Sequence, residues 1–152
     1  MIKKTGIDEK GTVTLQDLLK ILEKNPRKNE AGAITIFIGR TKKYTRKNEE
    51  TKGLELEAYR EKAEEVLAKI SNELEQRPGI IDVLIHHMIG RFNVGEDLVY
   101  VIVTGRSRRD AFPVLREAVE RYKHEAPIFK KELLASGESY WVSEDLKKKE
   151  DR

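Results

Sequence analysis

The sequence predicts an α+β fold in which helices pack on a mostly antiparallel sheet. Apolar residues recur at helical spacing over 60–76, whereas short runs rich in β-branched residues lie on both sides of that segment. From residue 53 the elements follow the order β-α-β-β-α-β, preceded by one further strand and a short helix. A chain of 152 residues is long enough to bury one core, so we expect a single domain over 1–152.

The first fifty residues are expected to form one helix, one strand and a long loop. A helix is predicted over 14–22, where Thr14 is a candidate cap and Asn25-Pro26 ends the segment. Residues 33–39 are β-branched and aromatic with glycine at either end, which predicts a buried strand. Residues 41–52 are polar and charged without a period, which predicts a mobile loop.

The middle of the chain carries the clearest patterns. Leucines alternate with glutamates over 54–59, which predicts a half-buried strand. The helix over 60–76 follows and ends at Pro78-Gly79. Two further strands are predicted over 80–89 and 98–104, and the second is apolar enough to be central in the sheet.

The start of the last long helix has two candidate caps. Ser107 with Asp110 would form a capping box, but Pro113 would then lie inside the helix. Asp110 as the cap places Pro113 in the first turn, where proline is tolerated, so we expect the helix to begin after Asp110. That choice leaves three arginines in the loop before the helix, and they are Arg106, Arg108 and Arg109.

The C-terminal part predicts short strands over 128–134 and 140–142, then a charged tail over 143–152 with little to bury. Three aromatic residues are expected in the core. A pocket wall is the alternative for two of them, and an interface for the third. They are Phe37, Phe129 and Trp141.

Composition excludes several classes of chemistry. The chain has no cysteine, so disulfides, thiolate metal sites, iron–sulfur clusters and a cysteine nucleophile are excluded. Its 30 basic and 27 acidic residues give a net charge of +3, a mixed surface that argues against nucleic-acid binding. The first residues lack the apolar core of a signal peptide and no run is long enough to span a membrane, so we expect a cytoplasmic protein.

Two lysines flank an enforced break in the backbone. Pro127 cannot continue a helix and pushes Ala126 out of the α region. Lys123 before the break and Lys130 after it would therefore lie near one corner, where two ammonium groups could hold an anionic substrate. The alternative is that both are ordinary surface lysines, which the last turn of a helix also favours.

Other basic residues of the chain could also bind an anion. The three arginines before the last helix form a good receptor for phosphate, although single arginines often pair only with surface glutamates. Lys42 lies close enough to the end of the strand over 33–39 to reach a site. A lysine in a partly desolvated basic cluster can act as an acid, a base or a nucleophile. Arg46 and Lys47 are expected to be solvated on the loop.

The three histidines do not suggest a metal site. His86 and His87 are adjacent on a strand and point to opposite faces, and His124 is isolated in the chain. We therefore expect each histidine to be structural, with no metal and no cofactor. No glycine-rich phosphate loop of Walker or Rossmann spacing is present.

Six motifs follow one another along the chain. They are Gly32-Ala33 through Phe37-Ile38-Gly39, Leu56-Glu57-Ala58-Tyr59, His87-Met88-Ile89-Gly90, Arg108 with Ala111-Phe112, Lys123 through Pro127 to Glu132, and Trp141-Val142. Together they resemble the large, catalytic subunit of molybdopterin synthase over about residues 30–142. The segments 1–30 and 143–152 show no motif that we can match.

The resemblance implies an α/β hammerhead-type fold. It also implies a homodimer of large subunits that forms a heterotetramer with two small ubiquitin-like sulfur carriers. The carrier would insert its C-terminal Gly-Gly thiocarboxylate into a pocket of the large subunit. The substrate would be cyclic pyranopterin monophosphate, which receives two sulfurs in turn to form the dithiolene of molybdopterin. The absence of cysteine fits, because the sulfur would arrive on the partner.

The same resemblance implies roles for individual residues. Lys123 matches the lysine on which catalysis depends, as proton donor and acceptor or as a transient covalent partner of the substrate. Lys130 matches the second essential lysine, which binds the pterin intermediate or the carrier terminus. Arg108 matches an arginine that binds the anionic substrate, reaching across the dimer. The predicted substrate-binding set is completed by Lys42, Arg109, Arg106, Phe37 and Lys131.

Three positions depart from the family pattern. Ser107 replaces a histidine, Lys42 replaces an arginine and loses its bidentate fork, and Met88 replaces a common arginine. Two alternatives therefore stay open. One is a carrier-binding paralogue that has lost activity, and the other is a non-catalytic basic α+β module that binds RNA or nucleotides.

Overall fold

The computed structural model describes residues 2–142, and the predicted tail over 143–152 lies outside them. These residues form one seven-stranded sheet and three α-helices, with one short 3-10 helix at Lys28–Glu30. The helices are α1 (Leu15–Glu23), α2 (Arg60–Glu75) and α3 (Arg108–Glu125). The strands are β1 (Thr5–Glu9), β2 (Ala33–Arg40), β3 (Thr51–Ala58), β4 (Ile80–Asn93), β5 (Asp97–Gly105), β6 (Ile128–Leu134) and β7 (Ser139–Val142).

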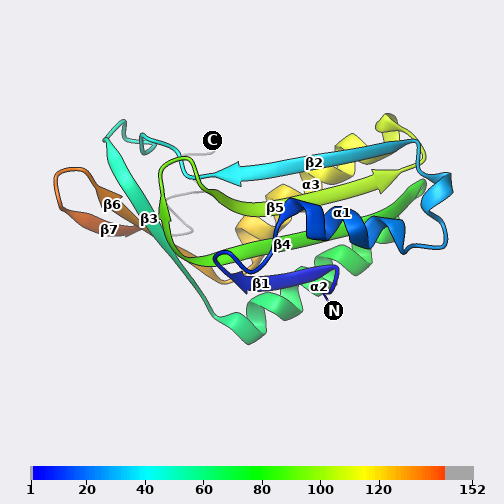
Figure 1. Ribbon diagram of the computed structural model, residues 1–152, viewed down its shortest axis with the longest axis horizontal. Helices are drawn as coiled ribbons and strands as arrows, with labels where there is room; N and C mark the ends of the chain where they lie inside the picture. Colours follow the sequence, from blue (N-terminus) through cyan, green and yellow to red (C-terminus); the bar gives the residue numbers. More distant parts are fainter. Residues whose placement is uncertain (1, 143–152) are drawn as a thin grey trace.

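The sheet is mostly antiparallel, as the sequence predicted. Its strands lie in the order β2-β5-β4-β3-β6-β7, and β1 pairs in parallel with β4 (Figure 1). The predicted α+β fold is confirmed, and every predicted helix and strand is present. The strand over 33–39 was expected to be buried, which is wrong, because β2 lies at an edge of the sheet and exposes Ile34, Ile36 and Ile38. β1 was not predicted, because Ile7 is its one buried residue and leaves too short an alternation to recognise.

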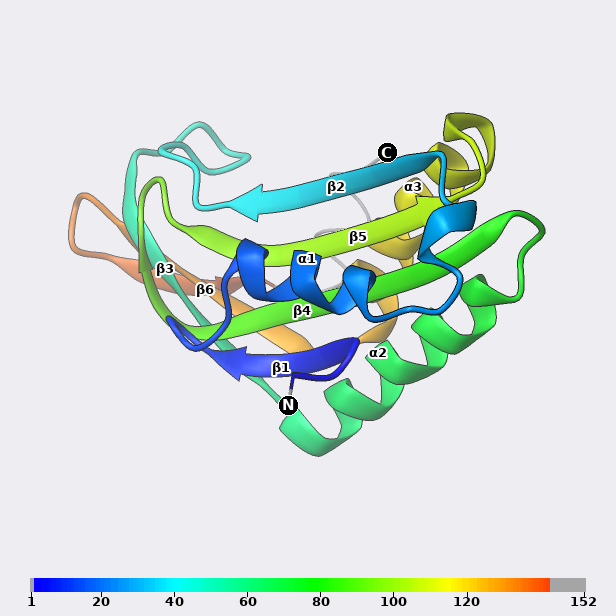
Figure 2. The same cartoon turned by 45° about the vertical axis from the view of Figure 1, so that its right-hand side comes forward.

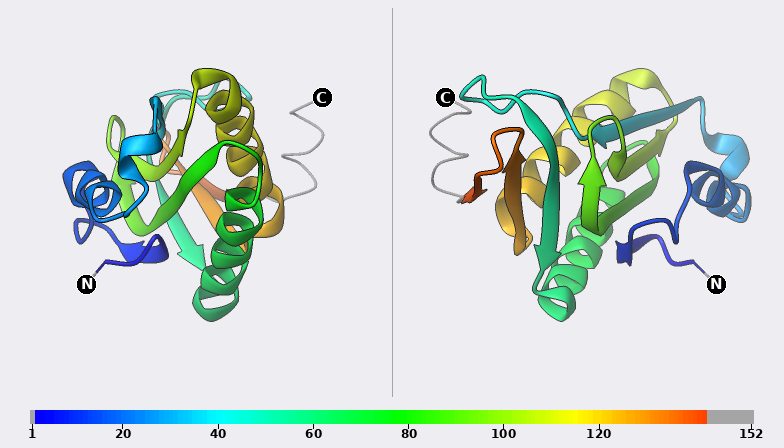
Figure 3. Two further views of the ribbon diagram at one scale, coloured as in Figure 1. Left: turned by 90° about the vertical axis from the view of Figure 1, so that its right-hand side faces the viewer. Right: turned by 60° about the vertical axis from the view of Figure 1, so that its left-hand side comes forward.

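β4 is the strand at which the sheet changes direction. It pairs with β5 from Ile80 to His87, and with β3 from Gly90 to Asn93. Gly90 has a φ of +125°, which residues other than glycine rarely adopt. It lies where the pairing of β4 with β3 begins. β3, β6 and β7 consequently cross the main part of the sheet at an angle, as Figure 3 shows. This angled part of the sheet provides one wall of the pocket described below.

Helices cover both faces of the main sheet. α1 lies on one face, in front of β4 and β5, and α2 and α3 lie on the other (Figure 2). The predicted cap of α1 is confirmed, because the Thr14 hydroxyl accepts from the Asp17 amide at 3.2 Å. On the other face, the Ser71 hydroxyl of α2 donates to the Val83 carbonyl of β4 at 2.6 Å. None of the helices in residues 2–142 is long and apolar enough to cross a membrane.

α3 begins earlier than the sequence predicted. Ser107 is its cap, since the hydroxyl oxygen accepts a hydrogen bond from the Asp110 amide at 3.4 Å. Asp110 is not the cap, and its carboxylate instead accepts from the Ser107 hydroxyl at 3.3 Å. Pro113 therefore lies inside the helix and removes one backbone hydrogen bond. Two of the three predicted loop arginines belong to the first turn of α3, and only Arg106 precedes it.

The segment between β2 and β3 is a loop, as predicted, but specific contacts hold it in place. Thr41 and Thr45 are buried, and Tyr44 forms an isolated antiparallel bridge with Glu50. The Ala135 amide donates to the Glu50 carbonyl at 3.0 Å, which ties the loop to the β6–β7 hairpin. The loop therefore folds against β6 and β7 instead of extending into solvent.

Two of the three aromatic residues expected in the core are exposed. Phe129 is 45% exposed on β6, and Trp141 is 49% exposed on β7. The core prediction is wrong for both because this part of the sheet turns their face outward. Phe37 is half-buried and lines a pocket, which is the alternative that the sequence left open.

Candidate active site

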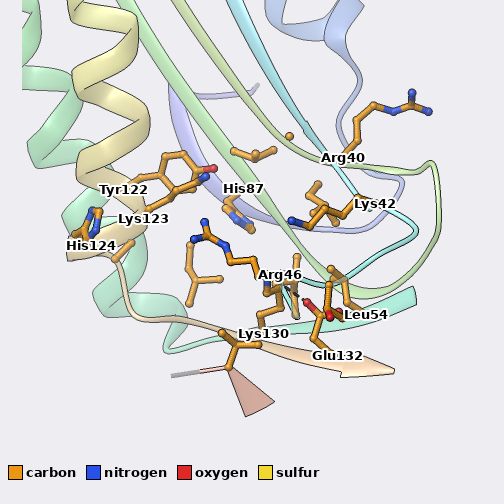
Figure 4. Close-up of a pocket in the computed structure, with 18 of the residues that line it drawn as sticks. Arg40, Lys42, Arg46, Leu54, His87, Tyr122, Lys123, His124, Lys130 and Glu132 are labelled. Atoms are coloured by element: carbon orange, nitrogen blue, oxygen red, sulfur yellow. Dashed lines mark ion pairs between the residues drawn. The ribbon is translucent and has the colours of Figure 1, made fainter. Parts of the chain in front are cut away.

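A pocket of about 360 Å³ opens where α3 ends beside the C-terminal end of β2. Its walls come from the strands β2, β3, β4 and β5, the loop after β2, the last turn of α3 and the β6–β7 hairpin (Figure 4). Apolar side chains of β3 and β5 lie among the lining residues, and most of the charged ones are cationic. The polar and aromatic side chains that matter most are Phe37, Lys42, Arg46, His87, Tyr122, Lys123, Lys130 and Glu132.

Lys123 and Lys130 meet in this pocket, as the sequence predicted. Ala126, the residue after α3, is extended (φ −81°, ψ 132°) ahead of Pro127, so the chain reverses into β6. The Lys123 ammonium lies 6.0 Å from the centre of the Phe37 ring, within the range of a cation–π interaction. The break at the proline therefore brings the two lysines to one site.

Glu132 lies beside Lys130 and was missed by the sequence analysis as a site residue. Its Oε1 is 3.3 Å from the Lys130 Nζ, and the two side chains are 6% and 24% exposed. Residues two apart on a strand share a face, so the spacing from Lys130 was the signal that could have identified it. Among the described lining residues Glu132 is the one acid, and it holds the Lys130 ammonium in place.

The pKa of Lys42 is lowered by its surroundings in the pocket. Burial is the largest cause, and the charges of Lys130 and Arg46 come next. Glu132 opposes the lowering, and Lys123 adds to it. Lys42 thus lies where the sequence predicted, within a cluster of cations whose mutual repulsion an anion would relieve.

The loop after β2 contributes more of the pocket than the sequence indicated. Arg46 and Lys47, which we expected to be solvated, both line it. The Lys47 ammonium lies 5.3 Å from the centre of the Tyr140 ring on β7. Both side chains are exposed, as expected, and they also line the pocket because the loop folds over the β6–β7 hairpin, a long-range contact that no local pattern encodes.

The adjacent histidines of β4 have different surroundings. The Nδ1 of His86 is 2.7 Å from the Asp8 carboxylate, and its Nε2 is 2.7 Å from the Lys3 carbonyl, so His86 joins β1 to β4. His87 is buried on the pocket side, where its Nδ1 donates to the Met88 carbonyl at 2.9 Å. His86 therefore has a structural role, whereas His87 also lines the pocket. Residues 2–142 hold no group of three or more side chains that could ligate a metal.

Four of the predicted site residues do not line the pocket of this chain. Arg108 lies at the other end of α3 from Lys123, roughly 22 Å away at 1.5 Å per residue. Arg109 follows it, and Arg106 lies 3.7 Å from the Glu30 carboxylate. Lys131 is on the opposite face of β6 from Lys130, with its ammonium 5.6 Å from the centre of the Trp141 ring.

Comparison with known families matches the chain to one of them. The family described as MoaE protein matches residues 10–125, which includes α1. The matched range therefore reaches into the segment 1–30, where the sequence alone offered no motif to match. The motifs of that segment are apolar positions at helical spacing, which do not distinguish one amphipathic helix from another.

Characterised sequences point to the same family. A molybdopterin synthase catalytic subunit of Bacillus subtilis is 36% identical over 137 residues, covering 90% of this chain and 83% of that protein. One from Pyrococcus abyssi is 37% identical over 119 residues, covering 77% and 78%. A probable molybdopterin synthase of Haloferax volcanii is 40% identical over 131 residues, covering 86% of this chain but 50% of that protein.

Solved structures share the fold. The crystal structure of molybdopterin synthase from Staphylococcus aureus superposes with a TM-score of 0.80 at 32% identity, covering 94% of this chain and 99% of that chain. The MoaE protein of Burkholderia ambifaria gives a TM-score of 0.73 at 30% identity, covering 93% and 89%. Sequence and structure agree that the chain belongs to the MoaE family of molybdopterin synthase catalytic subunits.

Proposed function

We propose that this protein transfers sulfur from the C-terminal thiocarboxylate of a small ubiquitin-like carrier to cyclic pyranopterin monophosphate, forming the dithiolene of molybdopterin. The observation that carries the proposal is the convergence of Lys123, Lys130 and Lys42 on one pocket of about 360 Å³. The chain has no cysteine, so its own side chains supply no thiol and the sulfur must come from a partner.

The cations of the pocket are suited to an anionic pterin. Lys130 and Arg46 are close enough to disfavour the charge of Lys42, so a bound phosphate gains charge-assisted hydrogen bonds and removes this repulsion at once. Lys130 is held by Glu132 and has a fixed direction. Lys123, over the Phe37 ring, is the residue for chemistry, either as proton donor and acceptor or as a transient covalent partner.

A small carrier subunit is the expected partner. The solved structure from Helicobacter pylori, which has a similar fold at a TM-score of 0.73, is a complex of subunits 1 and 2 of molybdopterin-converting factor. The pocket lies near the end of the sheet formed by β6 and β7, so an extended Gly-Gly terminus could enter it from the solvent side of that hairpin. Glycine is required in such a tail wherever the backbone must approach the lysines closely.

A homodimer would complete the site. β2 is an edge strand of the described sheet and exposes Ile34, Ile36 and Ile38, an apolar edge of the kind that pairs with another copy. Two β2 strands paired antiparallel about a twofold axis would place the N-terminal end of one beside the C-terminal end of the other. Arg108 of one subunit would then approach the pocket that contains Lys123 of its partner.

Reconstitution tests the proposed activity. The protein mixed with a cognate thiocarboxylated carrier and cyclic pyranopterin monophosphate should form molybdopterin, and Lys123→Ala should lower the rate by at least about 100-fold. Lys62→Ala, on the exposed face of α2, is the matched control and should retain the wild-type rate. Tight carrier binding by the wild-type protein with no product would contradict the proposal and favour an inactive paralogue.

A further inference from the structure

Tyr122 is a buried side chain that reaches the pocket from α3. The residue is 5% exposed, and its ring meets the His87 ring edge-on, with centroids 5.5 Å apart at an interplanar angle of 66°. It directly precedes Lys123 near the end of the helix and lines the pocket. In the view of Figure 4 its hydroxyl oxygen points from α3 into the pocket. The helix therefore brings a phenol as well as an ammonium group to the site.

The Tyr122 hydroxyl has no hydrogen-bond partner within residues 2–142. Tyr100 is similarly buried, and its hydroxyl donates to the Asp97 carboxylate at 2.8 Å. The Tyr122 oxygen is not one of the enclosed side-chain oxygens that lack a hydrogen bond, so it is open to the pocket. Polar groups of buried side chains are normally paired. The hydroxyl is therefore placed to pair with a ligand that enters the pocket.

The phenol is a neutral donor in a pocket of cations. Burial raises the pKa of Tyr122 above its ordinary value, and the charge of Glu120 adds to the effect. The hydroxyl consequently keeps its proton at neutral pH and can donate it to a hydrogen bond. An ammonium group attracts any nearby negative charge. A neutral hydroxyl instead selects the atom that accepts best, because hydrogen bonding depends on the acceptor and on direction.

The carrier terminus is the ligand on which such a choice has a consequence. A thiocarboxylate ends in one oxygen and one sulfur, and sulfur accepts hydrogen bonds only weakly. A hydrogen bond to the oxygen turns the sulfur to the other side. The oxygens of a phosphate differ little from one another, and they gain more from the cations around Lys42. The hydroxyl is therefore better suited to the carrier than to the phosphate of the pterin.

We infer that the Tyr122 hydroxyl donates a hydrogen bond to the thiocarboxylate oxygen of the carrier and so directs the sulfur toward the pterin. The inference rests on the proposed function, and it adds a contact that Lys123 and Lys130 do not supply. Each ammonium can attract the terminus through its charge, whereas the phenol distinguishes its two atoms. The hydroxyl keeps its proton throughout, so no bond of Tyr122 breaks.

Unfolding of the free protein tests the first part of the inference. Tyr122→Phe removes the hydroxyl and keeps the ring that packs on His87. It should unfold at the wild-type denaturant concentration or a higher one, because no internal hydrogen bond is lost. Tyr100→Phe, outside the pocket, loses its bond to Asp97 and should unfold at a lower concentration. A Tyr122→Phe protein less stable than the wild type would overturn the inference.

Carrier binding tests the contact itself. The probes are the cognate carrier with its Gly-Gly carboxylate, the same carrier without its last glycine, and the pterin alone. Tyr122→Phe should weaken binding of the complete carrier about tenfold, as for one hydrogen bond, and leave the other two affinities unchanged. Tyr100→Phe should bind all three like the wild type. An equal loss for both carriers, or a loss confined to the pterin, would overturn the inference.

Infrared spectroscopy of the complex reports on the oxygen directly. The carrier carries ¹³C in its terminal thiocarboxylate, which separates this C=O band from those of the protein. The band should lie at lower frequency in the wild-type complex than in the Tyr122→Phe complex, because a donated hydrogen bond weakens the C=O bond. The single-turnover rate of Tyr122→Phe should fall at least about tenfold. One band frequency in both complexes would overturn the inference.

These outcomes distinguish the inference from the function on which it rests. A wild-type protein that binds the charged carrier and forms no molybdopterin would contradict the proposed function. An active wild-type protein beside a Tyr122→Phe variant of equal rate and equal carrier affinity would leave the function standing and overturn the inference alone.

Discussion

Lys42 is the residue at which binding and stability oppose each other. Its pKa is lowered because burial and the nearby Lys130 and Arg46 disfavour its charge. A lysine with a lowered pKa in the folded state destabilises that state while it is charged. The destabilisation is complete below the lowered pKa and is relieved as the pH rises toward the ordinary value of 10.5. A bound anion would relieve it at neutral pH instead.

Lys42→Gln should therefore weaken substrate binding without weakening the fold. At pH 7 the free energy of unfolding should stay the same or rise by up to about 0.5 kcal/mol, as for other partly exposed positions. Affinity for the phosphate-bearing pterin should fall roughly tenfold, which is about 1.4 kcal/mol, because a charge-assisted bond is lost. Denaturant unfolding and calorimetric titration measure the two quantities.

The pH dependence of stability provides a control for the Lys42→Gln prediction. Any gain in stability of Lys42→Gln over the wild type should shrink as the pH approaches 10.5, because the wild-type lysine is then losing its charge. Lys62→Gln, on the exposed face of α2, should change neither stability nor affinity. A Lys42→Gln protein that unfolds more readily yet binds the pterin normally would contradict the account.

Single residues were predictable from the sequence where a local signal fixed their direction. Lys123 and Lys130 flank a proline break, and Lys42 follows the end of a strand, so their approach to one site could be predicted. Arg46 and Glu132 enter the pocket through the fold of a loop and the pairing of β6 with β3. Those contacts join residues far apart in the chain, and no pattern within one segment contains them.

At the scale of elements, α3 positions two charged groups at its opposite ends. Ser107 caps its first turn, which carries Arg108, and Lys123 lies near its last. The sequence favoured a later start because proline is usually excluded from a helix interior. The hydroxyl cap and the burial of Ala111 and Ala118 against the sheet together outweigh the one hydrogen bond that Pro113 removes.

Ser107→Ala should lower the free energy of unfolding by about 1 kcal/mol, the usual loss for a helix cap. Ser107→Asp should restore most of it, since a carboxylate accepts from the same amide and interacts favourably with the helix dipole. Denaturant unfolding of the three proteins measures the difference. If Ser107→Ala is as stable as the wild type, the helix does not depend on this cap.

β1 shows why one element was not predicted. It has five residues and pairs in parallel with β4 alone. What fixes it is a set of long-range contacts, above all the bonds from His86 to the Asp8 carboxylate and the Lys3 carbonyl. A strand held mainly by partners distant in sequence leaves little periodicity of its own.

At the scale of the whole molecule, the proposed dimer would complete the site. Arg108 and Lys123 lie at opposite ends of α3, and in the proposed dimer antiparallel pairing of β2 edges would join one to the other across a twofold axis. The sequence resemblance implied a homodimer in which Arg108 reaches across to the substrate, but not which edges pair. Composition and periodicity could not, because neither reports which surfaces meet between chains.

Mixing two inactive variants tests the composite site. Lys123→Ala and Arg108→Ala should each lose activity as homodimers. In a mixed dimer one site carries both substitutions and the other carries neither, so unfolding and refolding the two variants together should restore up to about a quarter of the wild-type activity, since half of the dimers are mixed. No restored activity, with mixed dimers present by native mass spectrometry, would place Arg108 and Lys123 in the same subunit's site or in none.

The most direct test of the central claim is a crystal structure of this protein with its thiocarboxylated carrier. The account predicts that the carrier's terminal glycine enters the pocket of about 360 Å³, with the thiocarboxylate within hydrogen-bonding distance of Lys123 or Lys130. A carrier terminus bound elsewhere on the molecule, with both lysines out of its reach, would contradict it.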